Sequence, residues 1–273
     1  MKENRQGQVM LGKILEIIKI NVKVNLAYAI NAWGAFIVTL LQIFVFYYIW
    51  MAIYKFDSVI NGISKNQIIT YIILSRIIYT QVTSGFIPRI GRKIHTGEIT
   101  MDLLKPMDFQ FFMFFGRIGD FVSFFAMTAF PILIICLFTL GMQAPLSFAT
   151  LIYFLLSLFM AITLSFFVEF WIGLLTFYTN YSWGLQTFQE ALISLFSGVL
   201  IPLSFFPGWL RTITNLLPFQ QMSYSPVSIY LGIVKGSQVF EVLGFQLLWI
   251  VILFILSRLF YSFAIKKITI QGG

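Results

Sequence analysis

The chain has 273 residues, of which 59% are hydrophobic and only 10% are charged, whereas soluble domains carry about 25% charged residues. This composition excludes an ordinary water-soluble domain and indicates a protein of the lipid bilayer. Its 18 Lys and Arg exceed its 10 Asp and Glu, for a net charge of +8. That excess is typical of the cytoplasmic side of a membrane protein, so we expect no nucleic-acid partner.

The amino-terminal segment, residues 8–25, mixes apolar and basic side chains with helical spacing. Ile14, Ile18 and Val22 repeat every four residues, and Lys19 and Lys23 directly follow the last two. The pattern predicts an amphipathic helix in the membrane interface, with its lysines toward anionic lipids. The alternative is a plain cytoplasmic extension of the first span.

Six apolar stretches are long enough to cross the bilayer, for which about 20 residues are needed. They must be helices, because an open sheet edge or an irregular loop cannot satisfy its backbone in hydrocarbon. The predicted spans are residues 26–53, 66–87, 118–140, 146–178, 183–203 and 241–265. The predicted fold is therefore an all-α polytopic membrane protein, with residues 1–273 forming a single transmembrane domain.

The distribution of basic residues predicts the orientation of the chain. Twelve lie on one predicted side: Lys2, Arg5, Lys13, Lys19, Lys23, Arg89, Arg92, Lys93, Lys105, Arg117, Lys266 and Lys267. Four lie on the other: Lys55, Lys65, Arg211 and Lys235. Both termini and residues 88–117 are thus predicted to be cytoplasmic, which agrees with an even number of spans.

The external stretch before the last span is too apolar for an ordinary loop. It contains short apolar runs that prolines begin or end, and such runs are too short to cross a bilayer. We predict two re-entrant helices in the outer leaflet, near 207–217 and 224–233. A folded external loop is the alternative.

A short charged stretch between the second and third spans has a helical pattern. Glu98 and Asp102 are four residues apart and share a face, next to Ile99 and Leu103, and Pro106 stops the helix. A helix of two turns is too short to be stable alone in water. We expect a partner protein to hold it, whereas the alternative is a loop that merely joins two spans.

Two stretches resemble the ABC-2-type transporter permeases. The cytoplasmic loop of these families is similar to Gly97-Glu98-Ile99 and the following residues 102–106. The same families resemble this chain at residues 117–121, Arg-Ile-Gly-Asp-Phe. The second stretch that resembles these families is residues 197–210, with its continuation at residues 216–219. The order of spans and short helices resembles the family over essentially the whole chain.

The resemblance implies the membrane subunit of an ATP-driven exporter in a cell membrane, typically a bacterial plasma membrane. A dimer, formed with a second copy or a related six-span permease, would enclose the pathway, and two cytoplasmic ABC ATPases would bind ATP and Mg. The implied coupling residues are Glu98, Ile99, Asp102, Leu103, Leu104, Lys105 and Pro106. We expect the two leucines to fill a groove on the ATPase and the two acids to lie at its rim.

The chain lacks the motifs of an enzyme. It has no phosphate-binding G-x-x-x-x-G-K-[ST] loop and no G-x-S-x-G, and His95 is its only histidine. Cys136 is its only cysteine, so it forms no internal disulfide. We therefore expect no cofactor or metal in this chain. A secondary transporter or channel without an ATPase remains the main alternative, and a membrane hydrolase using Glu169 and Glu190 a weaker one.

Four charges fall inside predicted spans away from the span ends, where they are costly and must face protein or water. They are Arg76, Glu169, Glu190 and Arg258. We predict that Arg258 pairs with Glu169 or Glu190, unless it snorkels to the interface. Arg76 is predicted to line the protein interior or the dimer pathway.

Overall fold

The computed structural model describes residues 2–179 and 181–267, so position 1, position 180 and positions 268–273 of the predicted domain lie outside the described residues. The described chain is helical apart from one hairpin and the connecting turns, which confirms the all-α fold class. The helices are α1 Lys2–Ala27, α2 Ala29–Ile53, α3 Lys65–Val82, α4 Phe86–His95, α5 Glu98–Leu103, α6 Phe109–Phe124, α7 Phe130–Thr139, α8 Phe148–Leu174, α9 Ser182–Phe196, α10 Gly208–Leu216, α11 Tyr224–Tyr230 and α12 Ser237–Ala264, and the hairpin pairs β1 Val59–Ile60 with β2 Ile63–Ser64.

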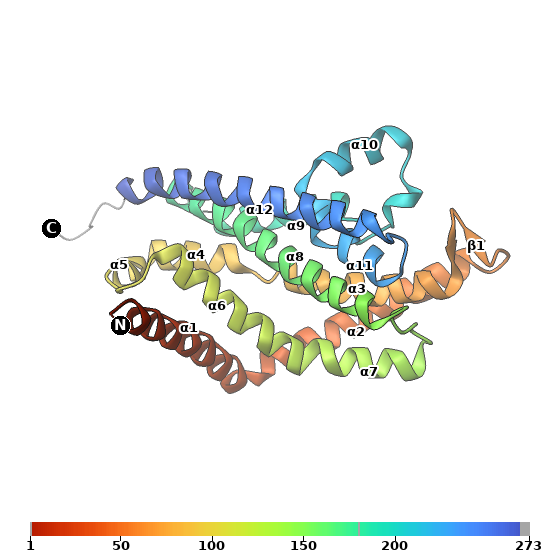
Figure 1. The fold of residues 1–273 in the computed structure, drawn as a ribbon, viewed down its shortest axis with the longest axis horizontal. Coiled ribbons are helices and arrows are strands. Elements are labelled where there is room, and N and C mark those ends of the chain that lie inside the picture. Colours follow the sequence, from red (N-terminus) through yellow and green to blue (C-terminus); the bar gives the residue numbers. More distant parts are fainter. Residues whose placement is uncertain (1, 180, 268–273) are drawn as a thin grey trace.

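Four helical stretches in the described part of the chain are long and apolar enough to cross a membrane. They are Ala29–Ile53, Phe109–Thr139, Phe148–Phe177 and Ser237–Ala264. The second joins α6 to α7 through a π-helical turn at Phe125–Ala129. These four correspond to the predicted first, third, fourth and sixth spans. Figure 1 shows α5 and the start of α1 at one end of the molecule and the β1–β2 hairpin at the other.

Helix α8 lies at the centre of the fold, because it packs against α12, α11 and α4. Phe166 and Phe170 on α8 are fully buried. The ring of Phe86 lies 5.4 Å from that of Phe166, and the ring of Phe109 lies 6.1 Å from that of Phe170. The aromatic core thus joins α8 to α4 and to the start of α6.

The predicted second and fifth spans coincide with shorter helices, and their carboxyl-terminal bounds were wrong. Helix α3 has 18 residues and α9 has 15. The chain leaves α3 through Gly85, whose φ of 74° favours glycine, and leaves α9 through Gly198, whose φ is 81°. Both turns lie within apolar sequence, so hydropathy extended the helices through them.

The third span begins earlier than predicted, at Phe109 rather than at residue 118. The carboxylate of Asp108 caps α6, accepting the backbone N–H of Gln110 at 3.1 Å and of Phe111 at 3.2 Å. Arg117 was assigned to the preceding loop and Asp120 to the start of the span, whereas both side chains are paired inside the bundle.

Helix α1 covers the predicted residues 8–25 and packs against α6. Two glycines of α6 allow this close approach: Gly116 and Gly119 lie against Asn21 of α1. One turn further on, Asn25 Nδ2 donates to Asp120 Oδ1 at 2.9 Å. The helix is therefore held to the bundle by small residues and a polar contact.

Two short helices lie where re-entrant segments were predicted, α10 and α11. Helix α11 is buried, whereas α10 exposes Trp209 and Leu216. The turn after α9, which precedes them, is held by α3: Tyr71 Oη donates to the Gly198 carbonyl at 2.6 Å, and Arg76 Nη2 donates to the Val199 carbonyl at 2.9 Å.

Replacing Gly119 with Ala should separate α1 from α6. The added Cβ would lie 2.8 Å from both the Asn21 Cβ and the Ile18 carbonyl oxygen, and the backbone cannot easily move. We expect a loss of about 1–3 kcal/mol in the free energy of unfolding, read as a lower melting temperature in detergent. Gly244→Ala is the matched control, because no atom lies within 4 Å of its added Cβ. Equal melting of the two variants would contradict this packing.

Candidate functional site

The candidate site lies at the end of the bundle that carries α5. Helix α4 packs against α8 and α9, and two glycines bring it close. A Cβ on Gly173 of α8 would lie 2.8 Å from Ile90, and one on Gly91 would lie 2.6 Å from Ser182. The chain then turns at Gly97, with a φ of 75°, into α5. Helix α5 is thus attached to the centre of the fold through α4.

One ion pair joins α5 to α4, and a second closes the turn that follows α5. Asp102 accepts Lys93 Nζ of α4 at 2.5 Å and Lys105 Nζ at 2.6 Å. Burial on its own would raise the pKa of the Asp102 carboxyl, but the hydrogen bonds from Lys105 and Lys93 outweigh it and lower the pKa below its usual value. Asp102 therefore stays ionised and fixes the orientation of α5.

This orientation corrects the prediction that Asp102 lies at the rim of a partner's groove, because the residue is only 4% exposed. Ile99 is also buried, and Leu103 packs partly against the main core. The outward apolar side chains are Met101, 67% exposed, and Leu104, 79% exposed. Glu98, Lys105 and Pro106 are exposed beside them. The sequence prediction omitted Met101, although its three-residue spacing from Leu104 places the two on one face.

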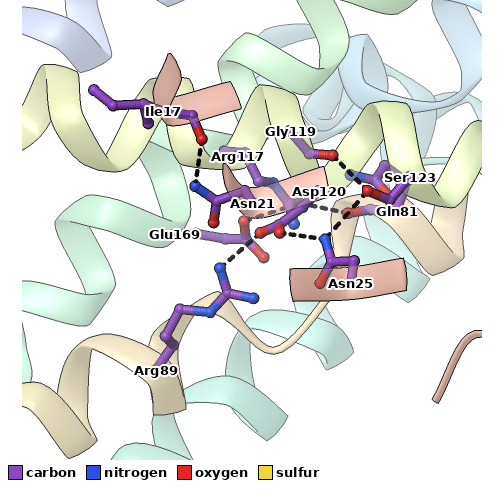
Figure 2. A network of polar contacts seen from close by, with 10 residues as sticks. All are labelled: Ile17, Asn21, Asn25, Gln81, Arg89, Arg117, Gly119, Asp120, Ser123 and Glu169. Atoms are coloured by element: carbon purple, nitrogen blue, oxygen red, sulfur yellow. Dashed lines mark hydrogen bonds and ion pairs between the residues drawn. The ribbon is translucent and has the colours of Figure 1, made fainter. Parts of the chain in front are cut away.

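A buried charge pair lies at the centre of a polar network between α3, α6 and α8 (Figure 2). Arg117 Nη2 lies 3.2 Å from Glu169 Oε2, and both side chains are at most 1% exposed. The same guanidinium nitrogen donates to the carbonyl oxygen of Gln81. Three helices therefore meet at one arginine, which belongs to the motif at 117–121.

The next acid of that motif continues the network to α1 and α4, as Figure 2 shows. Asp120 Oδ2 pairs with Arg89 Nη1 of α4 at 2.6 Å, while its Oδ1 accepts Asn25 of α1. Asn25 also donates to Ser123 Oγ at 3.4 Å. The two charges of the motif thus connect α1, α3, α4, α6 and α8 by polar contacts.

The remaining predicted charges have other partners than those expected. Arg258 does not pair with Glu169 or Glu190: its Nη1 lies 2.7 Å from Asp108 Oδ2. Asp108 was overlooked because the early start of α6 was missed. Glu190 accepts Gln186 Nε2 at 2.8 Å.

The prediction for Arg76 has a definite outcome. Arg76 is 4% exposed, and its guanidinium carbon lies 3.6 Å from the ring centroid of Phe46. It therefore lies in the protein interior, which was one of the two positions predicted for it.

The described residues offer no group of three or more His, Cys, Asp or Glu side chains that could hold a metal ion. His95, at the end of α4, is exposed, and Cys136 is buried. The described site thus combines exposed apolar side chains at α5 with a buried charge network.

A comparison with protein families matches residues 11–272 to the ABC-2 family transporter proteins. The chain belongs to this family. A comparison with curated proteins found no match. Family membership, with the apolar helices, identifies a multi-pass membrane protein that serves as the permease of an ABC transporter with a partner ATPase. This supports the ABC interpretation over a secondary transporter or channel without an ATPase.

Replacing Glu169 with Gln should destabilise the fold strongly, because it leaves the buried Arg117 without its counter-charge. Breaking a buried pair costs about 3–5 kcal/mol, whereas replacing both charges with apolar residues is often tolerated. We therefore expect the double variant with Arg117→Met and Glu169→Leu to have a higher melting temperature in detergent than either of these two substitutions alone. Glu190→Gln is the control, because its partner is the neutral Gln186. Additive losses in the double variant would contradict the pairing.

Asp102→Asn should loosen α5 without unfolding the bundle. The folded state lowers the pKa of Asp102, so the ionised form fully stabilises α5 at pH values above the ordinary Asp pKa of about 3.9. This stabilisation is lost as the pH falls through the lower pKa that Asp102 has in the folded state. We expect roughly tenfold faster amide hydrogen exchange in α5 for the variant. The control is Glu98→Gln, an exposed position on the same helix, and its α5 amides should exchange at the wild-type rate. Wild-type protection of the α5 amides in Asp102→Asn would contradict the role of the ion pairs.

Proposed function

We propose that this permease is an export subunit whose α4–α5 unit receives the movement of a cytoplasmic ATPase. The observation that carries the proposal is the exposed Met101 and Leu104 on a helix whose other face is pinned by Asp102. A surface that transmits force must be rigid on one side and open on the other. Helix α5 meets both conditions, and α4 connects it to α8 and α9.

The proposed topology has six spans, with α3 and α9 crossing as the shorter second and fifth. Each has polar contacts inside the bundle: Arg76 on α3 bonds the Val199 carbonyl, and Tyr79 Oη accepts a hydrogen bond from Ser194 Oγ of α9 at 3.0 Å. Both termini and α5 lie in the cytoplasm of a bacterial cell. Helix α1 lies at the membrane interface, where exposed Leu11 and Leu15 contact lipid. Helix α10 lies in the outer leaflet.

The proposed assembly contains two permeases and two ATPases. ATP sites of this class form between two ATPase subunits, and each permease supplies one α5, so two permeases are needed. The second permease is another copy or a related six-span chain. ATP hydrolysis, with Mg, takes place on the ATPases, and this chain is a transport subunit without enzymatic activity of its own.

Met101→Ala combined with Leu104→Ala should weaken binding of the ATPase while leaving the permease folded. Truncating central apolar side chains in an interface costs about 1–2 kcal/mol each, so we expect at least roughly tenfold weaker binding. The measurement is co-purification with the partner ABC ATPase and stimulation of its ATP hydrolysis.

Leu103→Ala is the matched control, because Leu103 packs against the core: it should lower stability more than it lowers ATPase binding. Normal transport by the double variant would refute the coupling face. An active complex with one permease and one ATPase would refute the proposed stoichiometry.

A further inference from the structure

A polar cavity of about 420 Å³ opens between α2, α3 and α6, next to the charge network. Amides and hydroxyls from all three helices line it, including Asn31, Gln42, Thr80, Gln81 and Ser123. Among the described residues that line it, the charged ones are Arg89 and Asp120, which pair with each other. Figure 2 shows both beside Asn25, which also lines the cavity. The cavity therefore offers hydrogen-bonding groups without a free charge.

A second cavity, of about 390 Å³, lies between α3, α7 and α8. Leu, Ile and Phe side chains make up most of its lining, among them Leu133, Leu137, Leu155 and Leu158. The polar lining residue Tyr230 is already satisfied, since its hydroxyl donates to the Gln143 carbonyl at 3.0 Å. This cavity suits a hydrocarbon chain.

The two cavities share a wall made by Gln81 of α3 and Phe124 of α6. Gln81 is 4% exposed, and its buried Nε2 has no hydrogen-bond partner among the described residues. A buried donor without a partner is unfavourable by about 1–3 kcal/mol, so a ligand that draws the Gln81 amide toward the cavity and accepts its hydrogen bond would gain affinity. Phe124 is only partly buried.

We propose that the two cavities together bind an amphiphile with an uncharged, hydrogen-bonding headgroup and a single apolar tail. The headgroup occupies the polar cavity and accepts from Gln81 Nε2, and the tail passes Phe124 into the apolar cavity. Each volume lies within the range of about 300–1,000 Å³ found for ligand sites. The described lining supplies no unpaired charge to hold a charged headgroup, and a plain hydrocarbon would leave the polar groups unpaired.

The test uses the full-length chain in phosphatidylcholine nanodiscs, without an ATPase. The probe is a monoacylglycerol with a diazirine at the end of its acyl chain, compared with a fatty acid and an alkane of the same length and label. We expect saturable cross-linking of the monoacylglycerol to α7 and α8, and roughly tenfold weaker labelling by the other two. Equal labelling by the alkane, or labelling spread evenly over the lipid-facing helices, would overturn the proposal.

Matched variants separate the tail from the headgroup. Leu155→Trp fills the apolar cavity and should weaken binding roughly tenfold, since excluding two methylenes has about that effect. Leu156→Trp is its control, because Leu156 is similarly exposed on the same helix but does not line the cavity. Equal labelling of these two variants would refute the tail site.

Gln81→Leu should weaken only monoacylglycerol binding, while Gln238→Leu, at the exposed start of α12, should change nothing. Unchanged discrimination between monoacylglycerol and alkane in Gln81→Leu would refute the headgroup site.

Adding the ATPase distinguishes the two sources of such an amphiphile. Release of the bound probe on ATP hydrolysis would identify the site as one for cargo, and retention would identify a resident lipid; either result supports the site itself. Because the labelling experiment contains no ATPase, its outcome is independent of whether α5 is the coupling element.

Discussion

The fold depends on neutralising Arg117 in an interior that offers almost no water. A buried charge is tolerated only when it is paired and hydrogen-bonded, and Arg117 meets this condition through Glu169 of α8 and the Gln81 carbonyl of α3. Those partners fix the rotation of α3, α6 and α8 about their axes, which hydrophobic packing alone would leave loosely defined. Apolar contacts supply most of the burial in this bundle, and this pair specifies which faces meet.

The same principle acts on the outside of the bundle at α5. A six-residue helix has too few internal hydrogen bonds to persist alone, so its position must come from its attachments. Asp102, held by Lys93 and Lys105, supplies one, and the burial of Ile99 supplies another. What remains outward is Met101 and Leu104, two apolar side chains that water does not favour. Their exposure follows from the ion pairs, because Asp102 has taken the inward face.

Much of this could be predicted from sequence, because long apolar runs and proline boundaries dominate the energetics of a membrane chain. The four long helices and the short α5, α10 and α11 were located within a few residues, apart from the start of the third span. The failures have two causes: Arg117 was taken as the end of a loop, and uncharged sequence carried the second and fifth spans past the turns at Gly85 and Gly198. Arg117 and Asp120 lie in the middle of Phe109–Thr139, and their partners come from helices distant in sequence. Contacts between residues far apart in sequence, such as Arg258 with Asp108, depend on how the helices pack. The periodicity of a single helix does not predict that packing.

Helix α6 links the docking surface to the cavities. Its first turn is capped by Asp108, which also holds Arg258 of α12; its middle carries Arg117 and Asp120; and its last turn supplies Phe124, the wall between the two cavities. Only a short turn separates its start from α5. Under the proposed coupling, a displacement of α5 would reach α6 through this turn and α3 through Arg117, and these two helices supply Phe124 and Gln81. If an ATPase moves α5, we expect the motion to reach the wall between the polar and apolar cavities through α6 and α3.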